Sequence, residues 1–217
     1  MSDAQTYETL KNELILNEQK NWVSNPSISQ FNIEAVFCLM TPQSKALASQ
    51  AVLDEVQGNI HMITAEMMGR HGVRFKNNKY ENIQEFLTKY KEYYDIYSGD
   101  SESKMVRDIF AESIRGYGYK EASHLCRNAG RSNGIAIVDR HILNCYINRF
   151  ELKHEGYELL APAYQYCVGI FNKDLSLTKD RYWLIEDCII NYSRHLQIPE
   201  KYLDMIWWSE KSGHLFK

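Results

Sequence analysis

Apolar residues recur at helical spacing along most of this chain, whereas the alternating pattern of half-buried strands is scarce. Shorter helical series occupy residues 105–114 and 122–129. The longest series follows positions i, i+3, i+7, i+10 and i+14 and comprises Tyr182, Ile185, Ile189, Tyr192 and Leu196. Turn signals built on proline, glycine and asparagine separate these segments. The pattern predicts an all-α protein with about ten helices.

The composition is that of a folded globular protein with an uneven distribution of charge. The 217 residues are 44% hydrophobic and 24% charged, values that argue against a disordered or low-complexity chain. The net charge of −3 excludes a uniformly basic coat. Residues 70–91 and 115–149 nevertheless each hold six Lys or Arg residues against two acidic residues, a net charge of +4. Such segments suit contact with a polyanion on one face, although helices of many proteins carry similar charge runs.

The cysteines and the N-terminal segment indicate where the protein acts. The five cysteines are scattered and form no C-x-x-C pair, which argues against a thiol zinc ribbon and favours reduced thiols. The N-terminal residues are polar rather than an apolar signal core, and no stretch approaches the roughly 18 apolar residues of a membrane span. We expect a soluble, cytoplasmic protein that does not bind membranes.

A glycine hairpin between two predicted helices carries the chemistry. An amphipathic helix leads to Ile114, Gly116-x-Gly118 follows, and a second amphipathic helix begins near Tyr119. Glycine permits positive φ and a close approach of the backbone to a ligand. The N–H groups at the start of the second helix then form an anion site suited to a DNA phosphate. This order of elements is typical of a helix–hairpin–helix motif.

Lys120 and Asp139 form a candidate pair for cleavage of an N-glycosidic bond. Lys120 falls in the first turn of the second helix, where the helix dipole and removal from water both favour the neutral amine that can attack carbon. Asp139 follows a short apolar run and precedes another amphipathic helix, so it fits an N-cap and can also stabilise positive charge on a sugar. A solvated surface lysine and an aspartate that only caps its helix are the alternatives.

These segments resemble the helix–hairpin–helix DNA glycosylase superfamily, in particular the small type-2 8-oxoguanine DNA glycosylase/AP lyases of the Ogg family. The superfamily resemblance depends on the hairpin together with Lys120 and Asp139. The further blocks that resemble the Ogg family are residues 37–45, 72–79 and 208–217. Together the similar blocks extend over nearly the whole chain, in the order found in the family.

The resemblance implies an all-helical, two-lobed unit over residues 1–217, with the active site between the lobes and the hairpin and catalytic segment at residues 105–150. It implies a monomer that removes 8-oxoguanine from double-stranded DNA by extruding the base. Lys120 would form a Schiff base and then drive β-elimination, with Asp139 as the catalytic carboxylate. A non-catalytic helix–hairpin–helix DNA-binding protein and a glycosylase for a different lesion remain alternatives.

The resemblance also assigns residues to DNA and base recognition. Gln43 matches the residue that fills the gap left by the extruded base, although a plain loop or helix-start glutamine is equally consistent with the sequence. Lys217 at the chain end and Trp208 match the base pocket, with Phe75 as a second stacking wall or a buried core residue. Without the resemblance, the terminal lysine would be a frayed end. The expected phosphate contacts lie in the hairpin and comprise Gly116, Tyr117, Gly118, Tyr119 and Lys120.

No cofactor is expected. The gaps between the cysteines do not fit the four closely spaced ligands of an iron–sulfur cluster, and no metal site is predicted, although a monovalent cation at the hairpin is left open. Cys126 and Trp207 are predicted to lie in the core.

Overall fold

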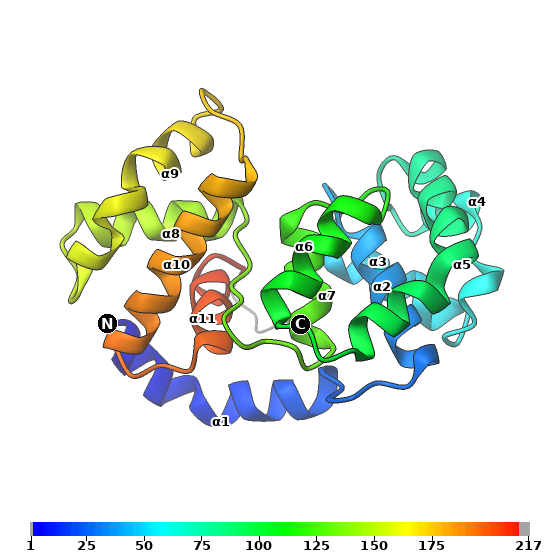
Figure 1. The fold of residues 1–217 in the computed structure, drawn as a ribbon, viewed down its shortest axis with the longest axis horizontal. Helices are drawn as coiled ribbons and strands as arrows, with labels where there is room; N and C mark the ends of the chain where they lie inside the picture. Colours follow the sequence, from blue (N-terminus) through cyan, green and yellow to red (C-terminus); the bar gives the residue numbers. More distant parts are fainter. Residues whose placement is uncertain (1, 213–217) are drawn as a thin grey trace. The chain divides into compact units, whose positions relative to one another are not determined.

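The computed structural model describes residues 2–212, and these form helices and loops with no strand. The all-α prediction is therefore confirmed for the described part of the chain. The helices belong to two compact units (Figure 1). One unit comprises Val23–Arg131, and the other joins Met1–Trp22 to Ser132–Lys217. The predicted catalytic segment at residues 105–150 thus contributes to both units.

The unit Val23–Arg131 is built around one buried helix. Its helices are α2 (Ile28–Met40), α3 (Ala46–Glu55), the 3-10 helix η1 (Ile60–Met62), α4 (Ala65–Arg70), α5 (Lys76–Ser98), α6 (Ser103–Ser113) and α7 (Tyr119–Asn128). Helix α2 packs against α3, α5 and α7, and α6 packs against α7. Because α2 is apolar around most of its circumference, it is buried on several sides, as expected for a central helix.

The second unit brings the N-terminal helix together with the C-terminal half of the chain. Its helices are α1 (Asp3–Asn21), α8 (Arg140–Glu151), the 3-10 helix η2 (Tyr157–Ala163), α9 (Tyr164–Phe171), α10 (Lys179–His195) and α11 (Glu200–Ser212). Helix α11 packs against α1, α8 and α10. Trp207 on α11 is fully buried beside Tyr192 of α10, which confirms its predicted place in the core.

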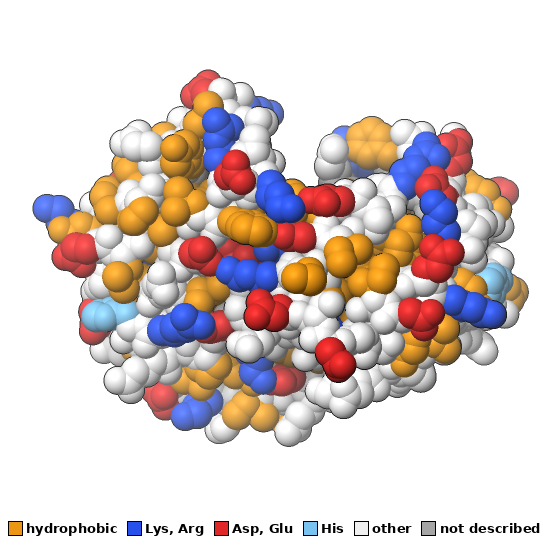
Figure 2. Space-filling model, in the orientation of Figure 1, with side chains coloured by type: hydrophobic (Ala, Val, Ile, Leu, Met, Phe, Trp, Pro, Cys, Tyr) orange, Lys and Arg blue, Asp and Glu red, His pale blue; other side chains and the backbone are white. Residues whose placement is uncertain are grey.

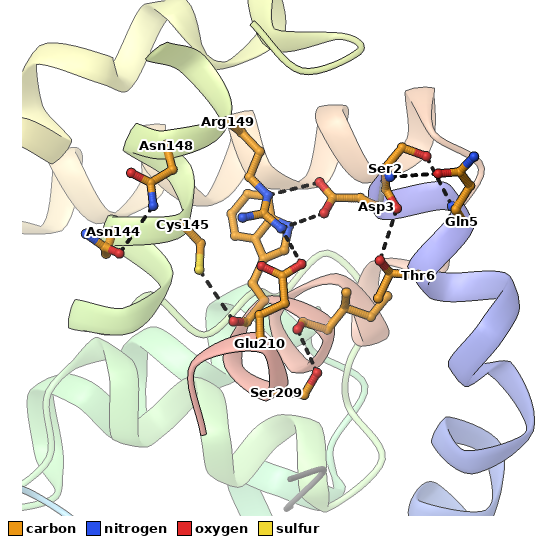
Figure 3. A network of polar contacts seen from close by, with 12 residues as sticks. Ser2, Asp3, Gln5, Thr6, Asn144, Cys145, Asn148, Arg149, Ser209 and Glu210 are labelled. Carbon is orange, nitrogen blue, oxygen red and sulfur yellow. Dashed lines mark hydrogen bonds and ion pairs between the residues drawn. The ribbon is translucent and has the colours of Figure 1, made fainter. Parts of the chain in front are cut away.

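A buried guanidinium joins three helices of this second unit (Figure 3). Arg149 of α8 donates hydrogen bonds to both carboxylate oxygens of Asp3, at 3.1 and 2.6 Å, and to Glu210 Oε1 of α11 at 2.7 Å. Its guanidinium also lies 4.9 Å from the ring centroid of Trp207. Burial alone would raise the pKa of the Asp3 carboxyl. The hydrogen bonds and the charge of Arg149, together with the hydroxyl of Tyr192 and the indole of Trp207, outweigh it, so that the pKa lies below its ordinary value.

The five cysteines are all buried, and none of them forms a disulfide bond. Cys126 is fully buried on α7, so its assignment to the core is confirmed. Among the described residues, no helix combines the length and the apolar character needed to cross a membrane.

Candidate active site

The hairpin between α6 and α7 is shaped by one glycine. Gly116 has a φ of +92°, and a Cβ at this position would lie 2.2 Å from Nδ2 of Asn82 on α5. Any side chain here would therefore be strained by the backbone angle and would also force the Asn82 side chain to move. The Tyr117 N–H donates to the Ile114 carbonyl at 3.0 Å and closes the turn. The sequence thus places glycine where both backbone angle and space require it.

The start of α7 presents backbone donors rather than tyrosine hydroxyls. Gly118 is the N-cap and has no side chain to bind the first-turn N–H groups, which have no carbonyl acceptor within the helix. The Tyr117 hydroxyl donates to the Ala35 carbonyl at 2.9 Å, and the Tyr119 hydroxyl lies 3.3 Å from Glu112 Oε1. Burial raises the pKa of Tyr117 well above its ordinary value. A phosphate contact at this hairpin would therefore use main-chain N–H groups.

Lys120 is not a fully solvated surface lysine. Its side chain is 26% exposed, and Nζ lies 3.7 Å from Glu121 Oε1. The adjacent Gly118 N–H donates to the other carboxylate oxygen of Glu121 at 3.2 Å. Glu121 therefore connects the N-cap of α7 to the amine that the sequence singles out as the nucleophile.

Asp139 belongs to the second unit and caps α8 as predicted. Its Oδ1 accepts a hydrogen bond from the Ile142 N–H at 2.9 Å. Among the described residues, no hydrogen bond uses Oδ2 of Asp139, and the side chain is partly exposed. One carboxylate oxygen thus serves the cap, while the other is available to a developing positive charge.

Side chains of α10 and α11 hold the segment that leads into Asp139. The three consecutive N–H groups before it donate to Glu186 Oε1 at 3.0 Å, Asp204 Oδ2 at 3.1 Å and the Tyr182 hydroxyl at 3.2 Å. All three acceptors are buried. Residues 136–138 are neither helix nor strand, so these side chains supply the partners that a regular element would otherwise provide. No local pattern in the sequence predicts this set of three acceptors, which we call the Asp139 clamp.

The remaining predicted residues are distributed between the two units. Gln43 is exposed in the loop between α2 and α3, and Phe75 is 54% exposed at the start of α5, so its alternative assignment to the core is wrong. Both lie in the unit that carries Lys120. Trp208 is partly exposed on α11, in the unit of Asp139. Lys217 lies outside the described residues.

The two basic segments contribute less surface charge than their sequence suggests. Lys79, Arg127 and Arg149 are each buried within their own units. On the face shown in Figure 2, acidic and basic side chains are intermixed rather than gathered into one basic field. Any phosphate contact therefore depends on local geometry, such as the hairpin, more than on net charge.

Comparison with known proteins places the chain among DNA repair enzymes. Residues 13–198 match the family model described as 8-oxoguanine DNA glycosylase. A similar protein from Fusobacterium nucleatum, named 8-oxoguanine DNA glycosylase/AP lyase, is 32% identical over 93% of this chain and 89% of its own length. One of the same name from Korarchaeum cryptofilum is 27% identical over 94% of this chain and 91% of its own.

Solved structures show the same fold. The 8-oxoguanine DNA glycosylase of Methanocaldococcus jannaschii aligns with a TM-score of 0.80 at 23% identity, covering 99% of this chain and 94% of that one. Its complex with a 15mer DNA containing 8-oxoguanine aligns with a TM-score of 0.76, also at 23% identity, and covers 99% of both chains.

Proposed function

This chain belongs to the 8-oxoguanine DNA glycosylase family, and from this premise we propose that it excises 8-oxoguanine from double-stranded DNA and then cleaves the strand. The observation that carries the proposal is Lys120, a partly buried amine in the first turn of a helix that a Gly-x-Gly hairpin introduces. A protein that only binds the DNA backbone has no need of an amine at this position.

Lys120 acts as the nucleophile in the proposed mechanism. Its neutral amine attacks C1′ of the damaged nucleotide, forming a C–N bond as the bond from C1′ to the base breaks. The base leaves with the bonding electron pair and takes up a proton. Loss of the amine protons and opening of the sugar give a Schiff base. Removal of a C2′ proton then expels the 3′ phosphate by β-elimination, which cleaves the strand.

Asp139 assists the first step. The sugar gains positive charge as the base departs, and a carboxylate held in place lowers the energy of that state. The same carboxylate accepts a proton from the attacking amine. The cap bond to Ile142 and the Asp139 clamp hold the carboxylate in one orientation, so little reorganisation is needed when the charge develops.

The DNA contacts follow from the chemistry of each position. The hairpin from Gly116 through Tyr119 binds a phosphate through main-chain N–H groups at the start of α7. The N–H groups of Tyr117 and Gly118 are not among them, because they already bond Ile114 and Glu121. Gln43 fills the space left by the extruded base, while Phe75 and Trp208 stack on that base. Lys217 supplies a donor and an acceptor to its edge. The protein acts as a monomer on chromosomal DNA in the cytoplasm.

The proposed chemistry uses only an amine and a carboxylate. We therefore expect base excision without an iron–sulfur cluster or a divalent metal. Dialysis against a chelator should leave the rate of strand cleavage unchanged, whereas a loss that added metal restores would contradict this. The rate of strand cleavage in potassium and in lithium buffers tests for a monovalent cation at the hairpin.

Strand cleavage on matched duplexes tests the function. A duplex with one 8-oxoguanine should be nicked to a 5′-phosphate and an unsaturated 3′ aldehyde, and borohydride should trap a covalent complex. The same duplex with guanine should give neither product. Binding to both duplexes without cleavage would support the alternative of a non-catalytic DNA-binding protein. Faster cleavage at another lesion in a panel of oxidised and alkylated bases would show that the preferred substrate is not 8-oxoguanine.

A further inference from the structure

A buried lysine outside the proposed catalytic pair holds the loop between α2 and α3. Lys79, in the first turn of α5, is only 5% exposed, although lysine is almost never buried without partners. Its Nζ donates three hydrogen bonds: to the Met40 carbonyl at 2.7 Å, the Pro42 carbonyl at 2.6 Å and Ser44 Oγ at 2.9 Å. All three acceptors lie at the end of α2 or in the loop of residues 41–45.

The three acceptors match the protonated form of Lys79. An ammonium has three N–H donors and no acceptor, whereas a neutral amine has only two N–H donors and could not donate to all three oxygens. Burial lowers the pKa of Lys79 to about 8, an effect that Glu121 opposes and that the positive charges of Lys120 and Arg74 increase. The ammonium therefore predominates at neutral pH.

These bonds enclose a residue with an unfavourable backbone angle. Gln43 has a φ of +54°, and it lies between Pro42 and Ser44, the two loop residues that Lys79 binds. A non-glycine residue in this region costs free energy and keeps its conformation only where its surroundings hold it. Since the Gln43 side chain is exposed, its own packing does not provide that support. Lys79 does so by fixing the backbone on both sides.

The same cluster reaches the exposed Phe75. The Ser44 hydroxyl accepts a second hydrogen bond, from the Arg74 N–H at 2.9 Å. The Lys79 N–H donates to the Phe75 carbonyl at 3.1 Å. Phe75 also has a positive φ, +57°. The bond to the Phe75 carbonyl is a main-chain helical bond, so the ammonium reaches Phe75 through Ser44 and the neighbouring Arg74 N–H. It reaches Gln43 through the bonds to Pro42 and Ser44 on either side.

We propose that Lys79 is a positioning residue that holds Gln43 and Phe75 as one rigid surface for an extruded nucleotide. This inference depends on the proposed function, because it needs a base to leave the duplex. Lys79 touches neither the base nor the reacting atoms. Its effect on the reaction passes through the loop of residues 41–45, so its removal should matter only where Gln43 is present to be positioned.

A fluorescent duplex can report this effect directly. The duplex carries 2-aminopurine next to 8-oxoguanine, and its fluorescence rises when the neighbouring base leaves the stack. All variants are made in a Lys120→Gln background so that the DNA stays intact. Lys79→Met is compared with Gln43→Ala and with the double variant. Lys76→Met serves as the matched control. Lys76 is exposed at the start of the same helix, and its replacement removes the same charge.

We expect Lys79→Met and Gln43→Ala each to lower the extrusion equilibrium about tenfold, the order expected when a charge-assisted hydrogen-bond cluster is lost. The double variant should show no further loss, since both changes remove the same contribution. The affinity of Lys79→Met for undamaged duplex should equal the affinity of Lys76→Met. Additive losses, or an extrusion signal of Lys79→Met equal to that of Lys76→Met, would overturn the inference.

A second variant covers the case in which Lys79→Met does not fold. Ser44→Ala leaves Lys79 in place but removes the oxygen shared with Arg74. It should lower extrusion in the same direction while the protein stays folded with a modestly lower melting temperature, and unchanged extrusion would overturn the inference. Wild-type protein is assayed for strand cleavage in parallel. If it leaves the 8-oxoguanine duplex intact, the proposed function itself fails, whereas normal cleavage with a silent Lys79→Met rejects only the role of Lys79.

Discussion

The Glu186 carboxylate, fully buried on α10, accepts a hydrogen bond from the Ala136 N–H at 3.0 Å. The residues are 50 positions apart in the chain, and the bond anchors an irregular segment three residues before Asp139. A buried main-chain N–H without a partner is costly, so Glu186 both stabilises this unit and sets the path of the backbone into Asp139.

Replacement of Glu186 should test this double role. Glu186→Met should lower the free energy of unfolding by about 1–3 kcal/mol, because it leaves the Ala136 N–H without its acceptor. Glu186→Gln retains a carbonyl oxygen and should recover most of the stability and the excision rate. Urea unfolding and single-turnover excision measure the two effects. Equal behaviour of the Met and Gln variants would contradict the importance of this bond.

Replacement of Asp139 should separate its role as the helix cap from its proposed role in base excision. Asp139→Asn should leave the free energy of unfolding nearly unchanged, since asparagine caps helices as well as aspartate does. The single-turnover excision rate should nevertheless fall by about 10²–10³-fold, because the charge facing the sugar is lost. Asp139→Ala should show the same loss of rate and about 1 kcal/mol less stability. An unchanged rate in the Asn variant would leave Asp139 as a cap alone.

Loss of the buried guanidinium should destabilise the unit that carries Asp139. Arg149→Met should cost about 3–5 kcal/mol at neutral pH, because it leaves the buried carboxylate of Asp3 without its cationic partner. The exposed ion pair of Arg115 with Glu81 and Glu85 provides a control, since Arg115→Met should cost less than about 1 kcal/mol. Urea unfolding measures both.

The Asp3–Arg149 pair should also be sensitive to acid. The folded-state pKa of Asp3 lies below its ordinary value of 3.8, so the stability it contributes is complete above that value and is lost as the pH falls through the folded-state pKa. The difference in unfolding free energy between wild type and Arg149→Met should therefore shrink in acid. A constant difference between pH 7 and pH 2 would contradict the pairing.

Extension of the chain should test the predicted role of its last residue. A short Gly-Ser extension after Lys217 moves the carboxylate away from the amine of that residue, and we expect poorer discrimination between 8-oxoguanine and guanine. Affinity for undamaged duplex should stay the same, since phosphate contacts lie in the hairpin. Excision rates on matched duplexes measure the effect, and full discrimination by the extended protein would remove Lys217 from base recognition.

Local signals in the sequence predicted much of this architecture. Helical periodicity marked α10, the Gly116-x-Gly118 pair marked the start of α7, and an acidic residue before an amphipathic helix marked the cap at Asp139. Each of these features depends on residues close together in the chain, where periodicity and capping rules apply. Prediction and structure agree most clearly at the glycine hairpin, where Gly116 has a positive φ and lies close to Asn82 of α5.

Features that depend on contacts between residues far apart in the sequence could not be predicted. The sequence places Lys79 in a basic segment that suits contact with a polyanion, but its ammonium is buried and donates to three oxygens of residues 35 to 39 positions away. Glu186 did carry a local signal, since it lies four residues after Tyr182 and three before Ile189, on the apolar face of the helical series. Its partner, the Ala136 N–H, could not be identified from the chain alone, because irregular backbone has no periodicity to reveal which groups need acceptors.

The identity of the residue joined to DNA tests the central claim most directly. Borohydride trapping on an 8-oxoguanine duplex, followed by proteolysis and mass spectrometry of the modified peptide, reads out which amine attacked C1′. The account predicts modification at Lys120, and no trapped complex with Lys120→Gln although that variant still binds the duplex. Modification at Lys79 or at the N-terminal amine of the wild-type protein, or trapping of Lys120→Gln at the wild-type yield, would contradict it.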